Sequence, residues 1–170
     1  LDLLVRVKDP VHHPHIKSPD FWDGDSLQFA IDTLQKGRVR DNLELGASWS
    51  EQKGAVLWKT SSPHLDGDLP DRYTTPNNPV LQYGKIKFIR KGDLSEYRIH
   101  IEPTELYSFV YSPGCRFRIS MLVNCSTKYR DSYLEWGSGI GKEKDPTLQG
   151  TLTVQVPDKP LFIQSDLNRR

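Results

Sequence analysis

Several features that define other protein classes are scarce in this chain of 170 residues. It has two cysteines, one methionine and no apolar run close to the roughly 20 residues that a membrane-spanning helix needs. It also has no excess of either charge, because 23 basic and 22 acidic residues give a formal net charge of +1. The bulk composition therefore favours neither a membrane protein nor a partner such as nucleic acid or an acidic membrane surface.

The two cysteines are too few for a disulfide-stabilised scaffold. The sequence between Cys115 and Cys125 alternates polar and apolar residues. As one continuous strand it would separate the two residues by about 33 Å, whereas a disulfide needs Cα atoms within about 7 Å. We therefore expect two free, buried thiols. They do not show whether the protein works in a reducing or an oxidising compartment.

Enzyme motifs are also lacking. The chain has no Gly-x-Ser-x-Gly, no phosphate-binding glycine loop, no His-Glu-x-x-His and no Cys-x-x-Cys. A glycosidase would need two carboxylates facing each other across a cleft, and no spacing among the acidic residues singles out such a pair. We therefore expect a domain that is not an enzyme.

Long segments with helical periodicity are absent, and alternation with a period of two takes their place. Such alternation is typical of half-buried strands. About nine short segments show it or are bounded by turn residues, which predicts an all-β fold, an antiparallel β-sandwich of immunoglobulin-like or jelly-roll-like type with long loops. The expected strands are 1–8, 26–32, 43–49, 55–59, 84–90, 96–101, 117–123, 133–136 and 152–156. The longest alternating run, 117–123, is expected in the middle of a sheet.

The expected domain covers residues 1–157, and 158–170 form a tail or linker. Because the chain opens directly on a strand, we expect it to be part of a longer protein and to lack the first strand of its own domain.

The segment 22–32 carries most of the functional signal. Trp22, Asp23 and Asp25 occupy a turn with Gly24, and a strictly alternating strand follows. Carboxylates in such a turn can hold a cation, and Ca²⁺ takes six to eight oxygen ligands. The candidate calcium ligands are Asp9, Asp23, Asp25 and Asn124. The alternative is ordinary turn chemistry, which Asp and Asn also favour.

Three histidines, at 12, 13 and 15, lie in the loop 11–21. We expect a solvated loop that prolines restrict. The alternatives are a transition-metal site or an axial haem ligand, the latter with Met121. Met121 lies on the apolar side of its predicted strand, so core packing is its expected role.

The four tryptophans differ in their expected roles. Trp49 falls on the apolar side of its predicted strand, so we expect it in the core. The sequence does not show whether Trp58 faces the core or the solvent. Trp22 and Trp136 adjoin polar, Gly-rich turns, where an indole can stay partly exposed and stack on the apolar face of a pyranose. The alternative is that both plug the ends of the sandwich.

Residues 21–32 resemble the Trp-x-x-Asp-Ser-(apolar)-Glu-(apolar)-x-(apolar)-Asp signature of family 9 carbohydrate-binding modules, which belong to the DOMON-like β-sandwich group. Further similarities follow in the family's order at 96–106, at Val123-Asn124, at Trp136 and at Lys144-Asp145-Pro146. The resemblance spans about residues 1–156. It implies a non-catalytic module of a larger secreted or cell-surface protein, such as a glycoside hydrolase or polysaccharide lyase. Such modules bind polysaccharides or oligosaccharides and structural calcium.

The resemblance also implies roles for single residues. Trp22 matches the first of two tryptophans that clamp a sugar, and Gln28 stands where a sugar-binding Glu is common. Lys144 stands where the second tryptophan is expected, and Trp136 lies earlier in the chain. Cys125 follows Asn124 where the family has Asp, which weakens a calcium ligand there.

The expected sugar-contacting residues are Trp22, Gln28, Trp136, Lys144 and Arg130, and the last two would suit an acidic sugar. Other expected partners are further domains of the same parent protein, with no nucleic acid and no membrane. Two alternatives are a docking domain that has lost its sugar site and a DOMON-type haem-binding domain.

Overall fold

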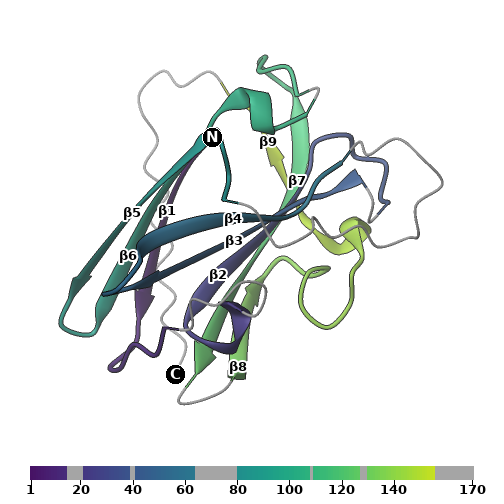
Figure 1. Ribbon diagram of the computed structural model, residues 1–170. Helices are drawn as coiled ribbons and strands as arrows, with labels where there is room; N and C mark the ends of the chain where they lie inside the picture. The colour runs from purple at the N-terminus through teal and green to yellow at the C-terminus, as the bar shows by residue number, and fades with distance from the viewer. Residues whose placement is uncertain (15–20, 39–40, 64–79, 108, 127–129, 156–170) are drawn as a thin grey trace.

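The computed structural model describes residues 1–14, 21–38, 41–63, 80–107, 109–126 and 130–155. They form two antiparallel sheets packed face to face, so the prediction of an all-β sandwich is confirmed (Figure 1). One sheet has the order β1 (Asp2–Lys8), β6 (Leu94–Ile101), β5 (Gly84–Lys91). The other has the order β4 (Gly54–Ser61), β3 (Leu43–Ser50), β2 (Ser26–Asp32), β7 (Arg116–Ser126), β8 (Arg130–Trp136), with β9 (Gly150–Thr153) also paired to β7. The predicted tail, 158–170, lies outside the described residues.

The hydrophobic core lies between the two sheets. Because side chains alternate across a strand, Leu27, Phe29 and Ile31 of β2 all point inward, and each is at most 1% exposed. The other sheet contributes residues such as Tyr97, Ile99 and Ile101 from β6. The alternating apolar residues of β3, such as Leu43 and Leu45, point into the same core.

Strand β7 is the longest strand, and it lies inside its sheet as predicted. It pairs with β2 on one side and with both β8 and β9 on the other. Its inward row includes Met121, which packs against the core as expected. Cys115 and Cys125 are free, as predicted, although both are only partly buried.

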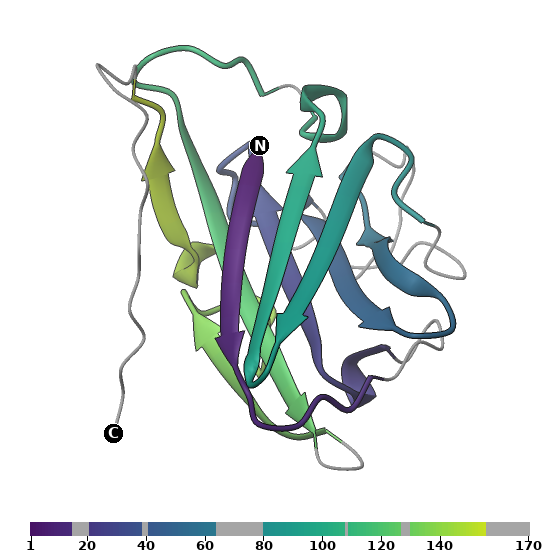
Figure 2. The ribbon, with the colours of Figure 1, turned by 90° about the vertical axis from the view of Figure 1, so that its left-hand side faces the viewer.

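Short 3-10 helices in the described part of the chain include η1 (Phe21–Asp23), η3 (Pro103–Glu105) and η4 (Pro146–Leu148). Figure 2 looks onto the three-stranded sheet, with the six-stranded sheet behind it. No helix in the described part of the chain is both long and apolar enough to cross a membrane.

Candidate functional site

The outward face of the six-stranded sheet carries Gln28. In the register of the sheet, Gln28 lies opposite Gly46 of β3 on one side and Leu122 of β7 on the other. Gly46 in turn lies opposite Trp58 of β4, and Leu122 lies opposite Glu135 of β8. This row crosses five strands on the face that points away from the core, and Gln28 is partly exposed at its centre.

An aromatic cluster covers one side of this row. The ring of Phe21, from η1, lies over Gly46, where a Cβ atom would overlap it. Phe21 stacks on Trp58 at 5.0 Å between ring centroids, and Trp22 meets Phe21 edge-on at 5.2 Å. Phe21 and Trp58 are buried, and Trp22 is partly exposed. Trp22 is therefore the ring of this cluster that can offer a surface to a ligand.

The segment 137–149 covers the other side of the row. It leaves β8 and folds back over the outward face, where Ile140 packs on Ala30 and Leu122. Oε1 of Glu135 accepts hydrogen bonds from the backbone N–H groups of Ile140 and Gly141, at 3.0 and 2.8 Å. These contacts hold the segment against the sheet.

Lys144 comes from this folded segment. Its Nζ donates to Oε2 of Glu44 at 2.8 Å, and Glu44 is an outward-facing residue of β3, next but one to Gly46. The side chains of Lys144 and Glu44 are 25% and 15% exposed. Trp22, Gln28 and Lys144 therefore belong to one face of the molecule. The amide, the carboxylate and the ammonium together offer both donors and acceptors to a ligand rich in hydroxyl groups.

The structure does not bring Trp136 to this face. Trp136 lies opposite Met121 in the register, on the side of β8 that points the same way as the core. Its ring lies against Gly150 of β9, and the side chain is 48% exposed because the three-stranded sheet does not cover it. Arg130 is the first residue of β8, opposite Ser126. Trp22 and Trp136 thus lie on opposite faces of the same sheet.

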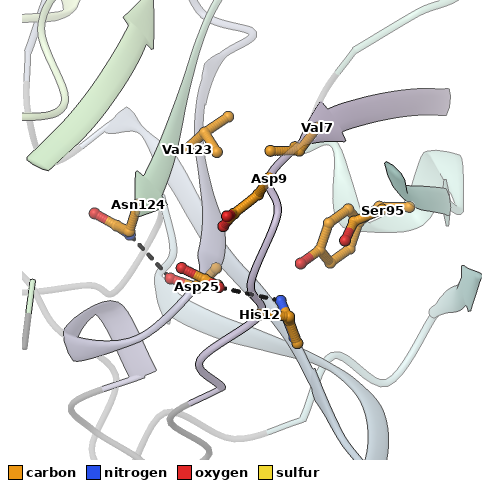
Figure 3. A pocket seen from close by; sticks show the side chains of 9 residues that line it. Val7, Asp9, His12, Asp25, Ser95, Val123 and Asn124 are labelled. Atoms are coloured by element: carbon orange, nitrogen blue, oxygen red, sulfur yellow. Dashed lines mark hydrogen bonds and ion pairs between the residues drawn. The ribbon is translucent and has the colours of Figure 1, made fainter. Parts of the chain in front are cut away.

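A small cavity of about 10 Å³ lies at the end of the sandwich near the N-terminal loop (Figure 3). Three of the four predicted calcium ligands, Asp9, Asp25 and Asn124, line it together with His12. The fourth, Asp23, lies in η1 and does not line it.

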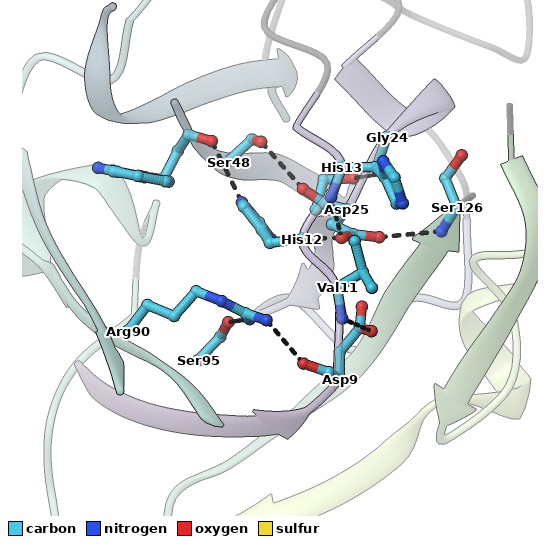
Figure 4. A network of polar contacts seen from close by, with 12 residues as sticks. Asp9, Val11, His12, His13, Gly24, Asp25, Ser48, Arg90, Ser95 and Ser126 are labelled. Atoms are coloured by element: carbon cyan, nitrogen blue, oxygen red, sulfur yellow. Dashed lines mark hydrogen bonds and ion pairs between the residues drawn. The ribbon is translucent and has the colours of Figure 1, made fainter. Parts of the chain in front are cut away.

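Asp25 is the centre of a hydrogen-bond network at this cavity (Figure 4). Its Oδ2 accepts from the backbone N–H of His13 at 2.6 Å and lies 3.3 Å from Nδ1 of His12. Its Oδ1 accepts from the backbone N–H of Ser126 at 2.9 Å. Burial by itself would raise the pKa of Asp25, but these hydrogen bonds to His12, His13 and Ser126 outweigh it and hold the pKa below its ordinary value.

These residues do not fit calcium at this point. Both oxygens of Asp25 already accept from N–H groups, and Oδ1 of Asp9 accepts from the backbone N–H of Val11 at 3.0 Å. The amide oxygen of Asn124 points away from Asp9 and Asp25 (Figure 3). No group of three or more His, Cys, Asp or Glu residues in the described part of the chain could hold a metal ion. Calcium binding by the chain stays a prediction without a ligand set among these residues.

The prediction of a solvated histidine loop is wrong for His12. Its side chain is 6% exposed and packs against two rings, Phe88 at 5.3 Å and Trp49 at 5.7 Å between centroids. Trp49 itself stacks on Phe88 at 4.7 Å, so it closes this end of the core as predicted. His12 is therefore a structural residue that anchors the N-terminal loop. His15 lies outside the described residues.

Sequence reasoning missed three residues of the outward face: Phe21, Trp58 and Glu44. Glu44 could have been found, because it lies on the polar side of its strand with Gly46 two residues later. The aromatic cluster had a weaker signal. No pattern near Phe21 in the sequence indicates that its ring fills the space above Gly46 of β3.

Solved structures share this fold. A family 9 carbohydrate-binding module from Caldicellulosiruptor kristjanssonii in complex with cellotriose matches with a TM-score of 0.63 and 16% identity, covering 96% of this chain and 74% of that chain. The family 9 module from the same organism in complex with glucose matches with a TM-score of 0.62 and 15% identity, covering 94% and 73%. No protein-family model and no curated protein matches the chain. The chain therefore has the fold of family 9 carbohydrate-binding modules.

Proposed function

We propose that this domain binds carbohydrate and catalyses no reaction itself. The observation that carries the proposal is the outward face around Gln28, on a fold that it shares with modules solved in complex with cellotriose and glucose. Trp22 supplies a partly exposed indole beside this face, and Gln28, Glu44 and Lys144 supply polar groups. A flat ring with polar groups at its edge suits a pyranose, which has an apolar face and a rim of hydroxyls.

The carboxylates of this face support a binding role rather than catalysis. Hydrolysis of a glycosidic bond needs an acid and a base or nucleophile that face each other across the scissile bond. Glu44 is paired with Lys144, and Glu135 accepts two backbone hydrogen bonds. Both carboxylates therefore have structural partners.

We also propose that the domain is one module of a larger secreted or cell-surface protein that acts on polysaccharides, with other domains of that protein as partners. The support is the resemblance of the segment 21–32 to family 9 modules and the shared fold. Structural calcium belongs to the same proposal, with its ligands outside the cavity at Asp25.

The test is binding of the purified domain to an array of neutral and acidic glycans, followed by titration with the best ligand. Replacing Trp22 by alanine should weaken binding about 30-fold, because a tryptophan at the centre of a contact is typically worth about 2 kcal/mol or more. Gln28→Ala should weaken binding less. The matched control is Trp136→Ala, which removes a partly exposed indole from the opposite face and should leave affinity unchanged.

Circular dichroism must show that each variant remains folded. Failure of the folded wild-type domain to bind any glycan would overturn the proposal. Loss of binding in Trp136→Ala but not in Trp22→Ala would move the sugar site to the other face of the sheet.

A second candidate function is docking to another protein domain. The ion pair between Lys144 and Glu44 favours it, because a charged pair occupies the place where the family resemblance expects the second tryptophan. A folded domain that binds no glycan and co-purifies with a neighbouring domain of its parent protein would support this candidate.

A further inference from the structure

The outward face of the three-stranded sheet is strongly basic, although the whole chain is nearly neutral. Strands β1, β5 and β6 present twelve outward-facing residues, which we call the basic face. Six are Lys or Arg and two are Asp or Glu, so the face carries a net charge of +4 against +1 for the chain. The cations are Arg6, Lys8, Lys85, Lys87, Lys91 and Arg98. The outer face of the three-stranded sheet is therefore more positive than the chain as a whole.

Three of these cations form a line along β5. Lys85, Lys87 and Lys91 are all exposed, and no described acidic side chain lies within ion-pair distance of them. Residues two apart on a strand are roughly 6.6 Å apart, so Lys85 and Lys87 form a closely spaced pair. Lys87 lies directly opposite Arg98 of β6. Like charges this close repel one another, so a bound anion would relieve the repulsion.

The same face already binds one carboxylate. Glu96 of β6 accepts from Nε of Arg6 at 2.9 Å and pairs with Nη2 of Arg98 at 2.6 Å. These two hydrogen bonds hold the pKa of Glu96 below its ordinary value. Because a guanidinium can donate to a carboxylate through several N–H groups, Arg98 retains donors for a second carboxylate.

The composition of the face argues against the other polyanions. Single-stranded nucleic acid needs aromatic rings on which its bases stack, and none of the twelve residues is Phe, Tyr or Trp. Peripheral membrane binding is strengthened by a contiguous set of apolar side chains that enters the lipid. The face has Leu4, Ile89 and Leu94, which lie on three different strands and in three different rows of the register.

We propose that the basic face is a second binding surface, and that its partner is a polysaccharide that carries carboxylates, such as a chain of uronic acids. The choice of a polysaccharide rests on the proposed function, while the charge of the partner follows from the face itself. The line from Lys85 to Lys91 runs along the strand, so an extended polyanion would lie parallel to β5. This surface is separate from the face around Gln28, because the two lie on opposite outer sides of the sandwich.

The test compares polygalacturonate with its fully methyl-esterified form, which keeps the backbone and loses the charge. The wild-type domain should bind the charged form and not the ester. Binding should weaken steeply between 0.01 and 0.15 M salt, because the Debye length falls from about 30 to about 8 Å. The double variant K85Q/K87Q should bind about threefold to tenfold more weakly at low salt, since an exposed charge pair contributes only modestly to binding.

The matched control is K36Q/K53Q, which removes the same charge from exposed positions elsewhere and should bind like the wild type. Trp22→Ala should also keep its binding to polygalacturonate, which separates this surface from the face around Gln28.

Equal losses in the two double variants, equal binding of the ester, or no binding of polygalacturonate would overturn the inference. Loss in Trp22→Ala alone would overturn it while supporting the proposed function. Binding of duplex DNA or of vesicles containing phosphatidylserine in place of polygalacturonate would overturn the choice of partner.

Discussion

Nδ1 of His12 lies 3.3 Å from Oδ2 of Asp25, and both side chains are buried, at 6% and 7% exposure. The pair joins the N-terminal loop to the start of β2. The backbone N–H of Ser126 extends the network to the end of β7. One carboxylate therefore connects three segments that are far apart in the sequence, which makes Asp25 a structural residue.

The first prediction concerns Asp25 and pH. Its lowered pKa means that the folded state binds the proton more weakly than the unfolded state, whose ordinary value is 3.8. The stabilisation is therefore present above about pH 4 and is lost as the pH falls through the folded pKa. Asp25→Asn should lower the stability at pH 7 by about 3 kcal/mol, or Tm by roughly 6–12 °C.

Thermal melts of the wild type and of Asp25→Asn between pH 2.5 and 7 would measure this effect. The difference in Tm should shrink as the pH falls below about 4, because the carboxyl of the unfolded chain takes up its proton first and that of the folded protein follows at lower pH. Asp23→Asn is the control, because Asp23 lies in the same turn and is partly exposed. A deficit for Asp25→Asn that stays constant down to pH 2.5 would show that packing, and not charge, is the reason for it.

A second prediction concerns calcium. Asp25 and Asp9 accept from backbone N–H groups, and the amide oxygen of Asn124 points away from both. We therefore expect this cavity to bind no calcium, so that it adds nothing to any difference in Tm between calcium and a chelator. A ligand at 100 times its Kd would add about 2.7 kcal/mol of stability, which calorimetry resolves easily. A calcium-dependent rise in Tm that survives in Asp25→Asn would place the ion elsewhere in the chain. A rise that disappears in Asp25→Asn would contradict our interpretation of the cavity.

Much of the fold could be predicted because each strand carries its own signal. The alternation in β2, β3 and β7 indicates both the strand and its inward side, since these strands are covered on one face by the core. The alternation that marks the inward side is missing in β8, where Tyr133, Leu134 and Trp136 are all at least one third exposed. An edge strand with two exposed faces gives no alternation, so nothing in the sequence assigns Trp136 to one face.

The candidate site was harder to predict because it depends on contacts between distant segments. Trp22 and Gln28 could be proposed from the family resemblance, and the structure places them by the same outward face. The pairing of Lys144 with Glu44 joins residues 100 positions apart, through a segment without periodicity. The opposite-face position of Trp136 depends on its register with Met121, which local sequence patterns do not specify.

A third prediction tests the aromatic cluster. Gly46→Ala places a methyl group inside the space that the ring of Phe21 fills, so the ring must move and Trp22 must move with it. Overpacking of this kind typically costs about 1–3 kcal/mol, and glycan binding should weaken as well. Phe21→Leu leaves more room, so the cost of Gly46→Ala should be smaller in that background, as a double-mutant cycle would measure. Equal costs in both backgrounds would show that Phe21 is not the obstacle.

The last prediction concerns Lys144, whose position the family resemblance assigns to a second aromatic clamp. Lys144→Trp removes the ammonium that pairs with Glu44 at 2.8 Å and adds an indole above the outward face near Gln28. If that face binds a pyranose, the new ring should raise the affinity for neutral oligosaccharides about threefold to tenfold, the range that an added aromatic contact typically supplies.

Lys144→Ala is the control, because it removes the same ion pair without adding a ring. Isothermal titration with cello-oligosaccharides would compare the three proteins. A gain of the same size in both variants would mean that the ion pair had only been blocking the face. No gain in Lys144→Trp, with the fold intact, would mean that the sugar does not lie between Trp22 and the segment that carries Lys144.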